Sequence, residues 1–357
     1  SFGGSMKIQF LKAFNGDSIL ISFVDKEGIN RNILVDGGTG RAYQFKNKRG
    51  KPEAGALQLA IQEIHKSKES IDLLILTHVD DDHIGGILKW FEKDPLAKDL
   101  VKKVWFNSGR LIFEDKAVPE VSSNLQIVKD SSSLDTSIKQ GISFEDYIEK
   151  HGIWDRKLIR KLENKTVLHE LGLSFTILSP DEVKLKSLLK KWTAEDKNLD
   201  TAKSDDYDKT IKKLLLQDQF TEDKSIHNGS SIAFILTFNE KNMLFLGDAH
   251  PLLLIKSLNE LGYSKDNPIK AEFMKVSHHG SKSNTCYELL ELVDTSKFIL
   301  SSNGDKHKLP HKQCLARIIN HNNNAELLFN YNLKVFSEQD VSDFPNFKYS
   351  EIHTMEF

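Results

Sequence analysis

The sequence predicts an α/β fold in which sheets carry helices on their outer faces, built as two halves around a charged helical insertion. Short β-rich runs alternate with segments of helical periodicity on both sides of residues 181–225. Those 45 residues contain 10 Lys or Arg and 11 Asp or Glu, far above the 28% charged residues of the whole chain. Hydrophobic residues make up 39% of the chain, which is too many for a disordered protein.

The first half is predicted to span residues 6–180, after residues 1–5 that we interpret as the remnant of an expression tag. We expect strands over 7–11, 18–23, 32–35, 73–76 and 174–178, and a helix over 54–66. Residues 111–170 show a mixed pattern from which no definite element is predicted. Gly16, Asp17 and Ser18 are interpreted as a hairpin turn between two strands.

The insertion is predicted over 181–227, and the second half over 228–357. Apolar residues at helical spacing indicate amphipathic helices in the insertion, whose charged face is either solvated or forms a lid or a partner surface. In the second half we expect strands over 231–236, 243–246, 272–276 and 298–300, and helices over 252–261, 286–292 and 312–320.

Composition narrows the class of protein. The net charge of -2 and the pI of about 6.7 argue against a generally basic nucleic-acid-coating protein, though not against a local basic site. Two Cys in 357 residues cannot build a disulfide scaffold. Apolar runs are much shorter than the roughly 20 residues of a membrane span. We therefore expect a cytoplasmic protein without a membrane partner.

The segment from Thr77 to Gly86 is the strongest chemical signal in the chain. It follows the buried strand pattern of 73–76 and contains His78, three consecutive Asp residues from Asp80 to Asp82, and His83. A helix N-cap would explain one Asp, but not three that are flanked by two His residues. Crowded carboxylates and imidazoles are stabilised when a cation organises them, so we predict a metal site.

This segment resembles the metal-binding signature of the metallo-β-lactamase superfamily, His-x-His-x-Asp-His. His78, Asp82 and His83 match it, and Asp80 stands where the second His is usual. Further likeness lies in segments 34–38, 228–231, 245–248 and 276–281. Together these segments are similar to the hydrolase domain of bacterial DNA-uptake (competence) proteins in the nuclease-like branch. Those domains also carry a late motif, which corresponds here to residues 302–304 and 309–311. Leu309 stands where that motif has a His. The resemblance implies a four-layer αββα sandwich.

The resemblance also implies a two-metal site. His78 and Asp80 would serve one cation, Asp82, His83 and one of His278 and His279 the other, and Asp248 would bridge them. We expect His278 and His279 to point to opposite faces of an extended strand, with His278 as the ligand and His279 joining Asp82 as a catalytic residue. Residues expected to orient ligands or contact substrate are Asp36, Ser281, Asn303, His307 and His311.

The expected cofactor is one or two Zn²⁺ ions. Because Asp80 replaces a nitrogen donor by an anionic oxygen, Mn²⁺ or Mg²⁺ is also possible. Alternatively, the first site is weakened and only one metal binds tightly. Lys282, Lys306, Lys308 and Lys312 flank the His motifs and are interpreted as solvated surface, although they would also suit an anionic substrate.

The predicted function is a metal-dependent hydrolase that attacks phosphoesters or nucleic-acid-like substrates with a metal-activated water. One alternative is hydrolysis of a lactone, a thioester or a β-lactam on the same fold. The other is a catalytically degenerate regulatory or interaction module of a bacterial defence or uptake system. In that case residues 181–227 would contact a protein partner.

Overall fold

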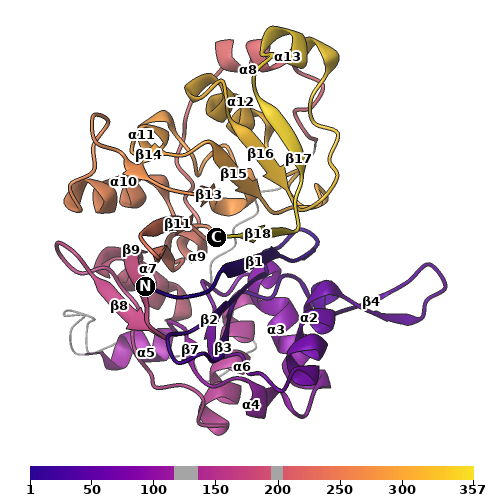
Figure 1. Cartoon of the computed structure of the whole chain (residues 1–357), viewed down its shortest axis with the longest axis vertical. Coiled ribbons are helices and arrows are strands. Elements are labelled where there is room, and N and C mark those ends of the chain that lie inside the picture. The colour runs from indigo at the N-terminus through magenta and orange to yellow at the C-terminus, as the bar shows by residue number, and fades with distance from the viewer. Residues whose placement is uncertain (116–135, 194–203) are drawn as a thin grey trace.

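The computed structural model describes residues 1–115, 136–193 and 204–357 of the chain. Two large β-sheets lie face to face, with helices on the outside of each (Figure 1). The predicted α/β fold with four αββα layers is thereby confirmed.

The first sheet has six strands. Their order is β18 (Thr354–Glu356), β1 (Met6–Phe10), β2 (Ile19–Val24), β3 (Asn30–Val35), β6 (Leu73–Ile75) and β7 (Val104–Trp105). Neighbours from β18 to β3 are antiparallel, whereas β3, β6 and β7 are parallel. The carboxyl ends of β3 and β6 therefore meet at one edge of the sheet, where the segment Thr77–Gly86 begins.

The second sheet has eight strands. Their order is β17 (Lys348–Glu351), β16 (Glu326–Phe329), β15 (Lys297–Leu300), β13 (Phe273–Lys275), β11 (Lys241–Phe245), β10 (Ala233–Phe238), β9 (Leu173–Ser179) and β8 (Val167–Glu170). The strands from β11 to β17 are parallel, and β8 to β11 are antiparallel. Two small two-stranded sheets pair β4 (Gln44–Lys46) with β5 (Pro52–Ala54) and β12 (Ile269–Lys270) with β14 (Val293–Asp294).

Successive side chains of a strand point alternately to the core between the two sheets and to the core beneath the outer helices. On β6, Leu73 and Ile75 face the core between the sheets, and Leu74 faces the helices. On β10, Phe234 faces the inner core and Ile235 the outer one. The outer helices are α1 (Gly40–Tyr43), α2 (Ala56–Lys66), α3 (Asp81–Lys93), α4 (Ala97–Leu100), α5 (Gly109–Glu114), α6 (Thr136–Lys150), α7 (Glu182–Thr193), α8 (Ile211–Leu216), α9 (Ile226–Gly229), α10 (Pro251–Glu260), α11 (Tyr287–Glu291), α12 (Lys312–His321) and α13 (Glu338–Asp343).

The charged segment contributes helices to both outer layers. On α7, Trp192 is buried where a side chain on Gly109 or Gly141 would collide with its ring, so this helix belongs to the core beside the first sheet. On α8, Ile211 and Leu214 are buried in the core beside the second sheet. Residues 194–203 of this segment lie outside the described part of the chain. The partner surface on 181–227 remains a prediction.

Several elements were not predicted. Helix α6 lies in the stretch of mixed pattern, whose residues 116–135 lie outside the described part, and the last three strands follow the last predicted helix. Strand β8 was not predicted either, and the predicted strand over 174–178, which is β9, pairs with it in the second sheet. The division into two halves at residue 180 stays a prediction. At the amino end, Phe2 packs against Phe23 and Phe238. In the described residues, we find no helix whose length and hydrophobicity would let it cross a membrane.

Candidate metal centre

The candidate ligands gather where strand ends from both sheets meet. His78 and Asp80 lie between β6 and α3, and Asp82 and His83 lie in the first turn of α3. Asp248 follows β11, and a 3₁₀ turn over Ser277–Gly280 follows β13. Packing the sheets face to face thus brings together residues from two distant parts of the sequence.

Asp248 is the shared residue of the cluster. Its Oδ2 lies 3.3 Å from Nε2 of His78 and 3.2 Å from Nε2 of His83, and its Oδ1 lies 3.8 Å from Nε2 of His279. Two groups in the described residues have ligand atoms that all lie within 4.8 Å of one another. They are His78, Asp80 and Asp248, called here the first group, and Asp17, His83, Asp248 and His279, called the second group.

Hydrogen bonds to Nδ1 orient both imidazoles of the second group. His83 Nδ1 donates to Oδ2 of Asp36 at 2.7 Å, and His279 Nδ1 donates to the carbonyl oxygen of Ser301 at 2.8 Å. These acceptors have no proton to offer, so the partners themselves determine the tautomer. The Nε2 lone pairs of the two rings consequently face each other at 3.3 Å, beside Asp248.

The imidazole of His78, in the first group, is likewise oriented by a hydrogen bond at Nδ1. Its Nδ1 lies 3.0 Å from Oγ1 of Thr77, which donates its own proton to Asp36 at 2.6 Å and must therefore accept from the ring. Nε2 of His78 and Oδ1 of Asp248 are buried and have no hydrogen-bond partner among the described residues. Imidazole nitrogens and carboxylates that converge in this way are held together either by protons on the rings or by a bound cation, and this donor set suits divalent metal ions.

The electrostatics favour positive charge at this point. Burial opposes protonation of His83, but the carboxylates of Asp248, Asp82 and Asp36 outweigh it and raise its pKa well above the usual value. Burial likewise opposes protonation of His279, whereas Asp17 and Asp248 raise its pKa to about 10. Burial would raise the pKa of Asp248, but the surrounding imidazoles hold it well below the usual range. A bound cation would take the place of these protons.

Asp17 is the residue of the cluster that the sequence analysis missed. Its Oδ1 lies 3.4 Å from Nδ1 of His279, and its Oδ2 forms a fully buried ion pair with Lys275 at 3.1 Å. A Cβ on Gly16 would lie 1.9 Å from the carbonyl oxygen of Asp82, so only glycine lets this loop lie so close. One signal was available, because Lys275 interrupts an apolar strand and needs a buried anionic partner.

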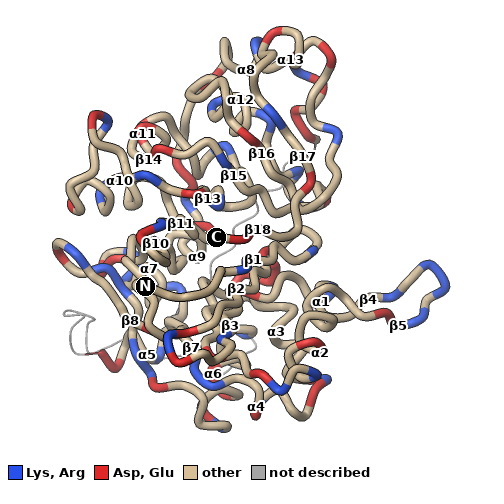
Figure 2. The backbone as a smooth tube through the Cα atoms, viewed as in Figure 1, with Lys and Arg blue, Asp and Glu red and all other residues tan. Residues whose placement is uncertain are grey.

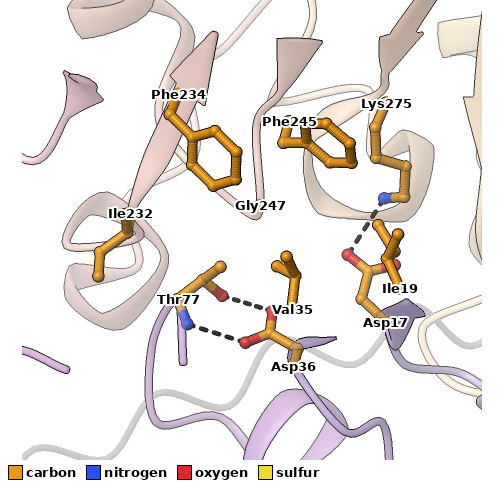
Figure 3. A pocket seen from close by; sticks show the side chains of 10 residues that line it. All are labelled: Asp17, Ile19, Val35, Asp36, Thr77, Ile232, Phe234, Phe245, Gly247 and Lys275. Atoms are coloured by element: carbon orange, nitrogen blue, oxygen red, sulfur yellow. Dashed lines mark hydrogen bonds and ion pairs between the residues drawn. The ribbon is translucent and has the colours of Figure 1, made fainter. Parts of the chain in front are cut away.

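A small cavity lies between the residues that support the ligands (Figure 3). It encloses about 10 Å³ between the sheets and is bordered by Asp17 and Lys275 on one side and by Asp36 and Thr77 on the other. Apolar side chains, among them Phe234 and Phe245, form most of the remaining lining, so the cavity belongs to the core between the sheets. The ligands are thus backed by two hydrogen-bonded pairs rather than by solvent.

His278 lies outside both groups. Its Nδ1 donates to Oδ1 of Asn284 at 3.0 Å and lies 3.6 Å from Oδ2 of Asp223. The expected extended conformation is wrong, because His278 and His279 have φ values of 49° and 54° inside the 3₁₀ turn. This left-handed turn directs the ring of His279 to Asp248 and that of His278 to Asn284 and Asp223.

The first group is the more open of the two. The side chain of Asp80 is 28% exposed, against 1% for Asp248. The carboxylate of Asp80 accepts a hydrogen bond from Ser137 on α6 at 3.3 Å. Asp82 is 14% exposed, and its Oδ2 lies 3.1 Å from Nε2 of His279. Solvent therefore reaches the cluster from the side of Asp80 and Asp82.

The remaining predicted site residues lie in loops around the cluster. Ser281 is buried and accepts from the backbone of Ser283, and Asn303 bonds Asp305 through its side chain. His311 accepts from the backbone N–H of Lys282 at 3.0 Å, and burial lowers its pKa to about 4.

Within the described residues, neither His307 nor His311 belongs to the two groups. Leu309, which replaces the expected His, is buried. Lys312 was expected on the solvated surface; that expectation is wrong, because its ammonium is fully buried against Asp340 at 2.6 Å. The ammonium of Lys312 therefore neutralises the buried carboxylate of Asp340 and does not contact a substrate.

Comparisons with known proteins agree with this arrangement. Residues 13–296 match the family model of the metallo-beta-lactamase superfamily. ComE operon protein 3 of Bacillus subtilis (strain 168) is 21% identical over 353 residues, covering 94% of this chain and 35% of that protein. The chain thus spans about a third of the length of this relative.

Two solved structures are also similar. One is an isothiocyanate hydrolase from Delia radicum gut bacteria, with a TM-score of 0.36, 12% identity and coverage of 98% of both chains. The other is a long form RNase Z from yeast, with a TM-score of 0.37, 12% identity and coverage of 98% of this chain and 41% of that one.

Proposed function

The chain belongs to the metallo-beta-lactamase superfamily, and on this premise we propose that it is a metal-dependent hydrolase of phosphoesters, with nucleic-acid-like substrates favoured. The observation that carries the proposal is the convergence of three imidazole Nε2 atoms on one buried carboxylate, Asp248. We propose a cytoplasmic location, as expected from the sequence.

The cation of the first group would be held by His78, Asp80 and Asp248. The cation of the second group would be held by Asp82, His83, Asp248 and His279. This assigns His279 as the ligand in place of His278. Asp82 fits better than Asp17, because it faces Nε2 of His279, whereas Asp17 faces the Nδ1 side and is already neutralised by Lys275.

Divalent cations bound there would supply an acidified water and positive charge for the oxygens of the attacked group. Asp82 lies at the solvent side of the cluster, so its carboxylate can accept a proton from the attacking water. The second group has two nitrogen donors and suits Zn²⁺, whereas the first group has two carboxylates and one imidazole and also accommodates Mn²⁺ or Mg²⁺.

Two features favour a phosphoester over a lactone, a thioester or a β-lactam. The motifs at 228–231 and 276–281 resemble the nuclease-like branch of the family. Two cation positions that share Asp248 also suit the in-line displacement of a phosphoester, in which both the attacking and the leaving oxygen carry charge. His278 is 22% exposed beside the cluster and is the group that could contact the substrate.

The test is hydrolysis by protein reconstituted with Zn²⁺, Mn²⁺ or Mg²⁺. The substrates are bis(p-nitrophenyl) phosphate, single- and double-stranded DNA and RNA, and a panel of lactones, thioesters and β-lactams. We expect turnover of the phosphodiesters that Asp248→Asn abolishes. Full metal occupancy without phosphodiester turnover would overturn the proposal.

A further inference from the structure

We propose that the β4–β5 hairpin is a binding arm that holds single-stranded nucleic acid beside the metal centre. The inference rests on the proposed function and names its substrate class. It starts from a protrusion on the side of α1 and α2, where the hairpin extends away from the body of the molecule with several basic residues at its tip (Figures 1 and 2).

The hairpin has a strong local charge in a chain that is nearly neutral. Lys46, Lys48, Arg49 and Lys51 fall within six residues, and Glu53 is the nearest acidic residue along the hairpin. All four cations are exposed, and no carboxylate of the described residues forms an ion pair with them. Cations that neutralise no protein carboxylate remain available to phosphate groups.

The tip of the hairpin is ordered by its own hydrogen bonds. Oδ1 of Asn47 accepts from the backbone N–H groups of Arg49 at 2.9 Å and Lys51 at 3.1 Å. The backbone N–H of Asn47 donates to Lys51 at 2.9 Å, and Gly50 takes the left-handed φ of 72° that the turn requires. Binding therefore has little backbone entropy to remove at the tip.

An aromatic contact joins the hairpin to the loop that carries Asp17. Phe45 on β4 packs edge-on against Phe14, with ring centroids 5.8 Å apart. The guanidinium of Arg41 lies 4.1 Å from the centroid of Phe14. Phe14 is three residues before Asp17, and its carbonyl oxygen accepts from the backbone N–H of Asn303.

A second aromatic ring continues this surface. The hydroxyl of Tyr331 accepts from the backbone N–H of Phe14 at 2.7 Å, and the ammonium of Lys12 lies 5.4 Å from the centre of its ring. Phe14, Phe45 and Tyr331 are half-buried. Cations and partly exposed aromatic rings thus lie together on the hairpin and on the loop that leads to Asp17.

This pattern favours a single strand over other polyanions. Unpaired bases can stack on aromatic rings while the phosphates contact the basic residues, whereas a duplex keeps its bases stacked inside. An anionic membrane would call for apolar side chains at the tip. The tip instead consists of Asn47, Lys48, Arg49 and Gly50.

The experiment measures binding separately from hydrolysis. Fluorescein-labelled oligo(dT) and oligo(U) of about 20 nucleotides, longer than a typical single-strand site, are titrated in EDTA by fluorescence anisotropy. KCl is varied from about 50 to about 200 mM, the range over which phosphate contacts weaken strongly. The arm variant is K46Q/K48Q/R49Q/K51Q. The matched control is K165Q/K241Q/K256Q/K270Q, which removes four exposed lysines from other parts of the chain.

We expect the arm variant to weaken binding by at least about tenfold and to lower the slope of log K against log salt by about 2 to 3, at about 0.7 per phosphate contact. The control should change affinity by less than about threefold. Equal weakening by both variants would overturn the inference. So would tighter binding of a duplex of the same length, or binding of phosphatidylcholine–phosphatidylserine vesicles in place of the single strands.

Failure of the arm and failure of the proposed function give different results. Both stand if the arm variant loses oligonucleotide binding but still hydrolyses bis(p-nitrophenyl) phosphate. Hydrolysis by a wild-type protein that does not bind single strands overturns the arm alone. Binding of single strands without hydrolysis of any phosphodiester overturns the proposed function and leaves the arm.

Discussion

The two groups of candidate ligands share Asp248 but differ in how firmly the protein holds them. In the second group both imidazoles are buried, and Asp36 and Ser301 fix their orientation. In the first group Asp80 is 28% exposed and bonds a residue of a separate helix. Because pre-orientation lowers the cost of binding, we expect the second group to bind its cation more tightly, and the open first group to exchange its cation and meet the substrate.

Asp248→Asn should have the largest effect, since it removes the carboxylate that both groups share. The amide keeps the volume of the side chain but loses its negative charge. We expect at least about a 100-fold loss of affinity for both cations, beyond the loss caused by removing a residue that only orients a ligand. Metal content after dialysis, measured by mass spectrometry, checks this. Asp266→Asn, at an exposed loop position, is the control, and two metals retained by Asp248→Asn would refute the shared role.

Exchanging the two neighbouring imidazoles for alanine tests the second group alone. We expect His279→Ala to lose one metal per chain, because its Nε2 faces Asp82, His83 and Asp248. His278→Ala should keep both metals, because its Nδ1 is directed to Asn284. The opposite result would restore the assignment expected from the sequence.

This pair of residues shows where prediction from the sequence ends. The resemblance to the metallo-β-lactamase signature implies that His78, Asp82 and His83 lie near Asp248, and it is the packing of the two sheets face to face that brings the ends of β6 and β11 together. The choice between His278 and His279 depends instead on two left-handed φ values that no local pattern announces.

The role of Asp17 could not be predicted from its local sequence either. On its own, the segment from Gly16 to Ser18 is a turn like many others. Its role depends on Lys275, 258 residues away in the sequence, and on the packing of one sheet against the other. The strand and helix patterns predicted the layers, but partners across the two sheets follow from packing that the sequence does not display.

The ion pair behind His279 offers a smaller perturbation that leaves every proposed ligand in place. In Asp17→Asn/Lys275→Met both buried charges are removed, so neither remains unpaired. We expect affinity for the second cation to fall by about 10- to 100-fold, as when other groups that orient ligand imidazoles are lost, while the first group is unchanged. Competition with a chelator measures this. Asp17→Asn alone should in addition lower the melting temperature, because it leaves Lys275 buried without a counter-charge; equal affinities in wild type and double variant would mean that the pair serves stability only.

Asp80→His should have the smallest effect on metal content and the most informative effect on activity. It replaces an anionic oxygen by a neutral nitrogen in the open group, so we expect both metals to remain and the first group to shift its preference from Mn²⁺ toward Zn²⁺ by a few-fold, in keeping with imidazole as a zinc ligand. Asp81→His is the matched control, because Asp81 is exposed and bonds Gln140 rather than the cluster. If Asp80 belongs to a working site, its substitution lowers phosphodiester hydrolysis and the control does not. A gain of activity would mean instead that the first group has decayed, and would favour an interaction module over an enzyme.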